Sequence, residues 1–254
     1  MITAEGFAKT FQYIDMFWEG LIATVVLSAL TVIFGFILAL VLALMRLSNI
    51  RPLAFLKPKG KDYGILNAIS NFNPIRFLAS VYVEVFRATP MLVQLFIVYH
   101  VLLGDLSLPT IKLFGFIRFE RMVPGVIALS LNSGAYLSEI IRSGIQSVDL
   151  GQTEAARSLG MNRIQTMRHI ILPQAIKNIL PAIANEFVTI IKESSICFTI
   201  GVQDLMAAVK TAQTAAFAIA EPLLLAAAIY FCLTFPTSKI IAYFERRMSR
   251  GDKR

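Results

Sequence analysis

Polar side chains interrupt long apolar runs in this chain, and their types limit the chemistry that they could perform. There are only two histidines and two cysteines: His100, His169, Cys197 and Cys232. Both cysteines lie in apolar segments, where the residue usually acts as a small buried hydrophobe rather than as part of a disulfide framework or a metal site. We therefore expect no catalytic residues and no metal site. Carboxylates, cations, hydroxyls and amides remain, and these can bind a solute.

When the apolar runs are read as helices, the polar residues fall on shared faces. Charged residues inside membrane spans are costly and usually face a bundle interior or an aqueous cavity. A zwitterionic solute needs both hydrogen-bond donors and acceptors along its route. The predicted substrate pathway consists of Gln94, Asn132, Ser133, Tyr136, Glu139, Lys192, Glu193, Ser194 and Ser195.

A structural interpretation of the same residues stays open. Glu84 with Arg87, and Glu139 with Arg142, are close in sequence and of opposite charge. They could form structural or gating ion pairs near the cytoplasmic boundary, where long side chains reach water. Gln94 could instead hydrogen-bond one helix to another.

The composition indicates that the elements carrying these residues lie in a membrane. Of 254 residues, 56% are hydrophobic and the mean hydropathy is +0.68. Only 16% are charged, against about 25% in soluble domains. The net charge of +8 is typical of the cytoplasmic loops of a membrane protein. The chain shows no basic patch with interleaved aromatic residues, so we expect no nucleic-acid partner.

Five apolar segments predict an all-α bundle of five transmembrane helices. They run from about Gly20 to Met45, Phe77 to Leu103, Met122 to Ile141, Leu180 to Gly201 and Pro222 to Phe244. Helices are expected because lipid offers the backbone no hydrogen-bond partners. Thr89-Pro90 interrupts the second segment and would permit a bend there.

The distribution of Lys and Arg predicts which side of the membrane each loop faces. The segment 46–76, the segment 142–177 and the tail after Glu245 together hold sixteen, whereas the opposite loops hold five. The richer side is expected to be cytoplasmic, which places the N-terminus outside and the C-terminus inside. We expect the whole chain, 1–254, to be one transmembrane domain. Within it, 1–18 would be an interfacial helix and 47–76 a cytoplasmic insertion.

The segment 149–174 is basic, lies on the cytoplasmic side and is predicted to form a helix–turn–helix elbow. Gly160 is a natural helix stop and Asn162 a natural cap for the next helix. Ile164, Met167, Ile170 and Ile171 recur at helical spacing, and Pro173 is expected to bend the chain toward the fourth span. We interpret this apolar stripe as a docking surface for another protein, although docking onto the chain's own bundle stays an alternative.

The elbow resembles the EAA loop of ABC importer permeases. Glu154, Ala155, Ala156, Gly160, Ile170, Leu172 and Pro173 match its seven fixed positions over twenty residues. The stretches VEVFRATPMLVQLFIVY, SLNSGAYLSEIIRSGIQSV and IIKESSICFTIGVQDLM are similar to the polar amino-acid uptake branch of that family. The branch more often has Lys-Asp-Thr-Ser where this chain has Lys192, Glu193, Ser194 and Ser195.

The resemblance implies the type I permease fold and a non-catalytic subunit of an amino-acid importer in the bacterial cytoplasmic membrane. It implies three kinds of protein partner: a cytoplasmic ATPase dimer engaged by the seven elbow residues, a second permease copy or paralogue, and an extracytoplasmic solute-binding protein. The chain has no Walker A motif, so ATP and Mg²⁺ would be held by the ATPase. The sequence gives less support to two other functions. A secondary transporter would predict internal repeats, and an intramembrane enzyme would need a convergent catalytic set; neither feature is found in the sequence.

Overall fold

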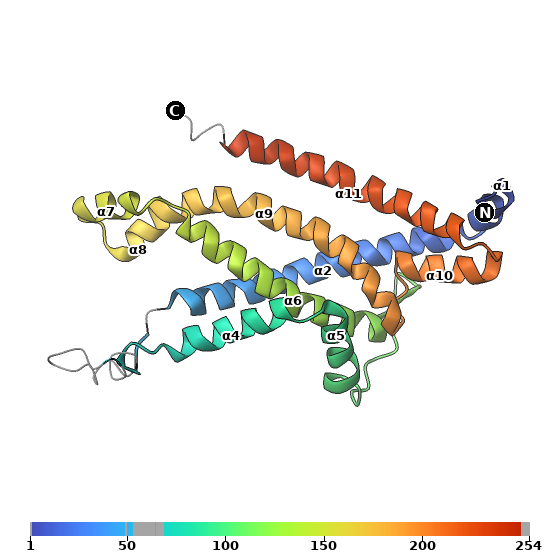
Figure 1. The fold of residues 1–254 in the computed structure, drawn as a ribbon, viewed down its shortest axis with the longest axis horizontal. Coiled ribbons are helices and arrows are strands. Elements are labelled where there is room, and N and C mark those ends of the chain that lie inside the picture. The colour runs from blue at the N-terminus through green and yellow to red at the C-terminus, as the bar shows by residue number, and fades with distance from the viewer. Residues whose placement is uncertain (1, 49, 53–63, 65–68, 250–254) are drawn as a thin grey trace.

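The computed structural model describes residues 2–48, 50–52, 64 and 69–249. Most of the expected insertion at 47–76 lies outside the described residues. The helices run along one long axis, and a single short hairpin is found in the described ranges (Figure 1). In chain order the elements are α1 (Ala4–Phe11), α2 (Ile14–Leu47), α4 (Pro74–Ala88), α5 (Met91–Phe96), η2 (Ile97–Leu102), β1 (Lys112–Leu113), β2 (Ile117–Arg118), α6 (Phe119–Gln146), α7 (Leu150–Ser158), α8 (Arg163–Thr166), η3 (Met167–Ile171), α9 (Leu172–Glu193), η4 (Ser194–Ile200), α10 (Leu205–Ala216) and α11 (Ala220–Ser249).

The long helix α2 is the central helix of the bundle, and α6 packs along it. Leu27 on α2 and Leu129 on α6 are buried in one apolar cluster near the middle of the molecule. A second cluster joins Ala39 of α2 to Leu137 of α6 and Ile179 of α9. The α6–α9 contact depends on Gly144, where an added Cβ would lie 2.3 Å from Cγ1 of Ile179. Small residues allow helix backbones to approach closely in this way.

The second expected span is not one straight helix. α4 and the pair α5–η2 meet at an angle of 110°, and α5 turns away from the long axis (Figure 1). The break falls at Thr89 and Pro90, as the sequence indicated. The residue before a proline avoids the α conformation, and Thr89 is extended, with φ −108° and ψ 145°.

Membrane-spanning length and apolarity are clear for part of the bundle. Within the described residues, α2 and α11 are long and apolar enough to cross a bilayer, and α4 with α5–η2 makes a third such element if it is counted as one broken span. α6 and α9 have 28 and 22 residues, or about 42 and 33 Å at 1.5 Å per residue, but they are not among the elements that meet this criterion. The count of five spans therefore stays a prediction.

The first eighteen residues do not form a single helix. α1 ends at Phe11 and α2 already begins at Ile14, so Trp18 belongs to the long helix. Thr3 caps α1 by accepting a hydrogen bond from the Gly6 amide at 2.9 Å, and the Thr3 amide donates to Glu221 at 2.9 Å. α1 is thereby tied to the start of α11, and it lies at the opposite end of the molecule from α7 and α8 (Figure 1).

Candidate functional site

The first half of the elbow is a short helix whose two ends are closed by side chain and backbone. Asp149 caps α7 by accepting a hydrogen bond from the Gly151 amide at 2.6 Å. At the other end the Met161 amide donates to the Ala156 carbonyl at 3.1 Å, and the Gly160 amide donates to Arg157 at 3.0 Å. This pair of bonds is a Schellman motif. It requires a left-handed residue, and Gly160 has φ +84°, so the expected helix stop is confirmed.

The second half of the elbow begins at Asn162, as the sequence predicted. The Asn162 side chain accepts from the Gln165 amide at 3.0 Å, and the Gln165 side chain accepts from the Asn162 amide at 2.8 Å. This reciprocal capping box satisfies two free amides at the start of α8. The turn between α7 and α8 is therefore specified by local sequence.

The chain stays helical through Pro173, and the expected bend there stays a prediction. The backbone is helical from Arg163 through Glu193, and Pro173 lies in the first turn of α9. The π-helical turn η3, Met167–Ile171, immediately precedes it. Such a turn lets a helix accommodate a residue without an amide hydrogen. The Gln174 side chain also donates to the Ile170 carbonyl at 3.0 Å.

Most of the expected docking stripe packs onto the chain's own bundle. Ile171 is buried, and Met167 and Ile170 pack against the same α2–α6–α9 cluster. Only Ile164 is exposed, at 78% of its surface, and the interpretation of the whole stripe as a docking surface is therefore wrong. Leu150 and Leu159, exposed at 78% and 84%, join Ile164 as large apolar side chains open to solvent on the elbow.

The seven motif residues of the elbow divide into two groups by burial. Glu154, Ala155, Gly160 and Pro173 are exposed, whereas Ala156 is buried and Ile170 and Leu172 are half-buried. The exposed members lie with Leu150, Leu159 and Ile164 on the same small elbow. An exposed set of large apolar residues at one end of a protein is typical of an interaction site. We name the four exposed motif residues and these three apolar residues together the elbow surface: Leu150, Glu154, Ala155, Leu159, Gly160, Ile164 and Pro173.

Gln94 and Asn132, two of the predicted pathway residues, meet at the break between α4 and α5. The Gln94 side-chain amide donates to the carbonyls of Phe86 and Thr89 at 2.8 and 3.0 Å. The Asn132 amide donates to Gln94 Oε1 at 2.8 Å and to the Phe86 carbonyl at 3.3 Å. Both side chains are buried. They satisfy carbonyls that the Pro90 break frees. The hydrogen bond between Asn132 on α6 and Gln94 on α5 is the helix-to-helix bond that the sequence offered as an alternative role for Gln94.

Glu139 lies between two arginines near the end of α6 that adjoins the elbow. It forms an ion pair with Arg142, as expected, and a second ion pair with Arg46 at the end of α2. The side chains of Arg46, Glu139 and Arg142 are 13%, 24% and 27% exposed. Sequence reasoning missed Arg46, because it is 93 positions from Glu139. Its place directly after the first apolar run was the available signal.

The expected pairing of Glu84 with Arg87 is wrong. Within the described ranges no ion pair joins them, and both are exposed. The Arg87 guanidinium instead lies 5.5 Å from the ring centroid of Tyr136 on α6. This cation–π contact connects α4 to the predicted pathway face.

Four of the remaining pathway residues lie where α9 ends and η4 begins, and the fifth, Ser133, lies on α6. Lys192 and Glu193 are exposed, Ser194 is buried and Ser195 is half-buried. Ser194 and Ser195 donate to the carbonyls of Ile191 and Lys192 at 2.8 and 2.7 Å, at the change from α9 to the tighter helix η4. Ser133 is buried beside Gly35 of α2, and its hydroxyl has no partner in the described part of the chain.

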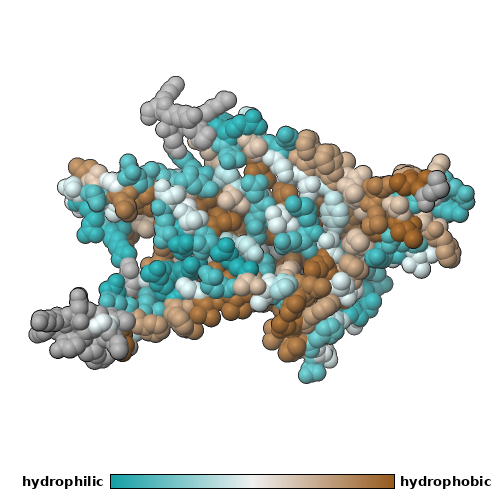
Figure 2. All heavy atoms as spheres, in the orientation of Figure 1, coloured by the Kyte–Doolittle hydropathy of each residue, from teal (hydrophilic) through white to brown (hydrophobic). Residues whose placement is uncertain are grey.

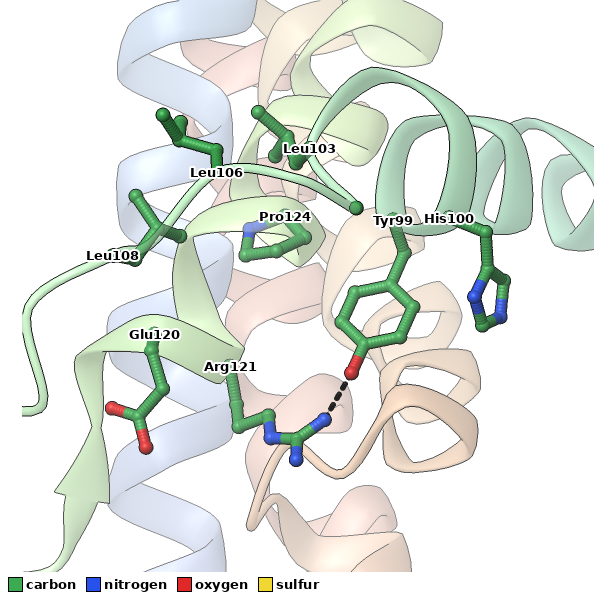
Figure 3. Close-up of a pocket in the computed structure, with 9 residues that line it drawn as sticks. Tyr99, His100, Leu103, Leu106, Leu108, Glu120, Arg121 and Pro124 are labelled. Atoms are coloured by element: carbon green, nitrogen blue, oxygen red, sulfur yellow. Dashed lines mark hydrogen bonds between the residues drawn. The ribbon is translucent and has the colours of Figure 1, made fainter.

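A cavity of about 400 Å³ lies at the far end of the bundle from the elbow. We name it the outer cavity because the distribution of Lys and Arg predicts that this end faces outside. Arg121 reaches across it from the first turn of α6 and donates to the Tyr99 hydroxyl and, at 3.3 Å, to the Ile200 carbonyl (Figure 3). No sequence pattern indicated this site, because its members belong to three different segments: η2, the loop that follows it, and α6. Its lining consists of Tyr99, His100, Leu103, Gly104, Leu106, Leu108, Glu120, Arg121 and Pro124.

Comparison with known proteins identifies this combination of helical bundle and elbow. Residues 63–250 match the family described as binding-protein-dependent transport system inner membrane component. The chain is 38% identical to the arginine transport system permease protein ArtQ of Bacillus subtilis over 246 residues, covering 97% of this chain and 98% of the relative. It is 36% identical to a putative glutamine transport system permease protein GlnP of Rickettsia conorii over 248 residues, covering 94% and 98%.

Solved structures show the same fold. A crystal structure of an amino acid ABC transporter with histidines contains a chain that is 40% identical, with a TM-score of 0.80 and coverage of 97% of this chain and 100% of that one. A MetNI methionine ABC transporter in an inward-facing conformation is 17% identical, with a TM-score of 0.58, and supports the fold alone. The chain has the type I ABC permease fold.

The chain belongs to the family of binding-protein-dependent transport system inner membrane components. It is the membrane permease subunit of an ABC importer and resides in the inner membrane, while ATP hydrolysis belongs to a separate subunit. Transport systems of this kind include an ATPase and a binding protein. The resemblance drawn from the elbow and span motifs is confirmed.

Proposed function

We propose that this permease carries a polar amino acid into the cytoplasm by alternating access, with partner ATPases driving the change. The elbow surface is the observation that carries the proposal. It combines the spacing of the EAA loop with a rigidly capped turn and exposed apolar side chains. The amino-acid substrate is supported by the names of the relatives, an arginine permease and putative glutamine permeases.

The proposed arrangement has five spans, with the N-terminus outside and the C-terminus in the cytoplasm. α2, the broken α4–α5–η2 element, α6, α9 with η4, and α11 are the spans, and residues 1–254 form one domain. α1 is an interfacial helix, because Phe11 is 53% exposed while its polar Thr10 is buried. The insertion 47–76 and the elbow 149–174 lie on the cytoplasmic side. The sixteen-to-five split of Lys and Arg supports this orientation.

A second permease copy or a paralogue covers the polar face of the bundle. Glu84, Arg87, Lys192 and Glu193 are exposed on the single chain, and each charge facing lipid near the bilayer centre would cost about 2.5–3.5 kcal/mol. Hydrophilic residues gather in the middle of the face in Figure 2, over α6 and α9. A facing subunit would turn this surface into an aqueous path, lined by the predicted pathway residues.

Within each subunit the pathway residues have different tasks. Gln94 and Asn132 hold the α4–α5 break, and Glu139 with Arg46 and Arg142 holds the cytoplasmic ends of α2 and α6 together. Tyr136, Lys192, Glu193 and Ser195 are open to the path, and Ser133 and Ser194 lie behind it. Glu84 and Arg87 border the path on α4. ATP and Mg²⁺ are held by the ATPase, and this chain requires no cofactor of its own.

Copurification with the ATPase tests the elbow surface. Glu154 is an exposed carboxylate there, and Glu5 on α1 is an exposed carboxylate at the far end of the molecule. Glu154→Lys should weaken recovery of the ATPase with the tagged permease, whereas Glu5→Lys, which makes the same charge reversal, should leave recovery unchanged. Equal recovery with both variants would contradict the assignment of the elbow surface.

A further inference from the structure

The outer cavity contains a cation that has no anionic partner. The Arg121 guanidinium donates through Nη1 to a hydroxyl and a carbonyl, and it lies 5.8 Å from the Tyr99 ring centroid. In the described part of the chain no carboxylate is within ion-pair distance of it. Its Nε and Nη2 have no acceptor among the described residues. These two nitrogens are the pair that binds a carboxylate side-on through two parallel hydrogen bonds.

A carboxylate with an unused oxygen also lines the cavity. Glu120 Oε1 accepts from Arg118 at 2.8 Å. Its Oε2 is shielded from solvent and has no hydrogen-bond partner in the described ranges. Glu120 and Arg121 leave the first turn of α6 in different directions (Figure 3), so the two charges lie at separate places along the wall. Because this oxygen is shielded, Glu120 acts on a solute in the cavity as a nearby negative charge and not as a direct hydrogen-bond acceptor.

The cavity also has apolar lining, although His100 adds a further polar side chain beside Tyr99. Leu103, Leu106, Leu108 and Pro124 supply the apolar side chains (Figure 3). The volume of about 400 Å³ lies in the range of sites that hold small molecules. A guanidinium, a separate carboxylate and an apolar wall together complement a ligand that has a carboxylate, an ammonium group and a carbon chain.

We propose that the outer cavity binds an α-amino acid, with Arg121 holding the carboxylate and the negative charge of Glu120, on the same wall, attracting the ammonium group. The site lies at the end of the bundle opposite the elbow, so it would receive the solute before it enters the membrane path. This inference rests on the proposed function, because it takes an amino acid as the solute. It adds a binding site within the permease itself, distinct from the residues of the polar face.

Direct binding tests the site without the binding protein. The ATPase–permease complex in lipid nanodiscs is titrated with radiolabelled L-arginine and, separately, L-glutamine, and we expect saturable binding of one or both. Arg121→Gln should raise the Kd by about tenfold or more, as loss of a charge-assisted bidentate bond implies. Lys112→Gln is the matched control, because it removes one exposed positive charge from the outer hairpin without touching the cavity.

Three results would overturn the proposal. The first is an absence of saturable binding by the unaltered complex. The second is an unchanged Kd in an Arg121→Gln complex that elutes and unfolds like the parent. The third is loss of binding-protein stimulation of ATP hydrolysis with an unchanged Kd, which would make Arg121 a contact for the binding protein.

Two additions keep the test decisive. If Arg121→Gln fails to fold, Glu120→Gln replaces it, with the same expected loss of affinity and the same control. Uptake by the unaltered system is measured in parallel with all twenty amino acids and the binding protein present. Failure of that uptake contradicts the proposed function, whereas normal uptake with unaltered binding by the variants contradicts the site alone.

Discussion

Gly160→Ala should separate ATP hydrolysis from transport, because Gly160 fixes the turn between α7 and α8. Its φ is +84°, and an added Cβ would meet no atom within 4 Å. The cost of alanine is therefore backbone strain alone, about 1–2 kcal/mol for an L-residue in the left-handed region. Such a change shifts the population of the capped turn by a factor of about 5–30. The amount of amino acid taken up per ATP hydrolysed should fall by up to that factor.

Gly115 offers a matched control for this strain. It has φ +82°, and nothing lies within 4 Å of its added Cβ, but it is located in the outer hairpin between β1 and β2. Gly115→Ala therefore carries the same conformational cost at the opposite end of the molecule. Gly160→Asn should be milder than Gly160→Ala, since asparagine tolerates this conformation.

The assay compares amino-acid uptake per ATP hydrolysed in proteoliposomes that contain the permease, its ATPase and the binding protein. Gly160→Ala should lower that ratio, and Gly115→Ala should leave it at the parental value, with both proteins inserted to the same extent. Equal ratios for the two alanine variants would refute the reasoning that the shape of this turn transmits the ATPase movement.

Three further predictions follow from described contacts. Glu139→Gln leaves Arg46 and Arg142 without an anionic partner at a mostly shielded site and should lower the free energy of unfolding by about 1–3 kcal/mol, while Glu5→Gln, at a solvent-exposed pair, should leave it unchanged; similar unfolding curves for the two variants would contradict this. A Leu159→Cys substitution in a Cys232→Ser background should react with an impermeant maleimide in inverted vesicles, and labelling from outside intact cells would contradict a cytoplasmic elbow. Burial raises the pKa of Asp204 to about 7, above its value in the unfolded chain. The stability that the protonated carboxyl contributes is therefore fully present below about pH 4 and is lost as pH rises through 7. Asp204→Asn, which keeps the helix cap, should flatten the dependence of thermal stability on pH between 5 and 8, and an unchanged pH dependence would contradict the assignment.

Local signals in the sequence predicted the elbow well. Gly160 and Asn162 act through their own backbone and neighbouring residues, so their roles as stop and cap could be recognised from type and spacing. The break at Thr89-Pro90 was predictable for the same reason. Its angle of 110° was not, because it depends on the buried side-chain amides of Gln94 on α5 and of Asn132, which comes from α6.

Tertiary contacts decided what the sequence left open or predicted wrongly. The stripe of Met167, Ile170 and Ile171 has a docking surface's periodicity, but periodicity alone cannot tell an internal partner from an external one. Arg46 joins Glu139 across 93 positions, and Arg87 contacts Tyr136 rather than the nearer Glu84. The outer cavity likewise assembles residues from η2, the loop that follows it and α6, which no spacing rule connects.

ATP-dependent uptake by the purified, reconstituted system tests the central claim most directly. Proteoliposomes containing the permease, its ATPase and the binding protein are loaded with ATP and Mg²⁺ and given radiolabelled L-arginine or L-glutamine. The account predicts uptake that requires all three proteins and ATP. Uptake by the permease alone under an ion gradient, or no ATP-dependent uptake of any amino acid, would contradict it.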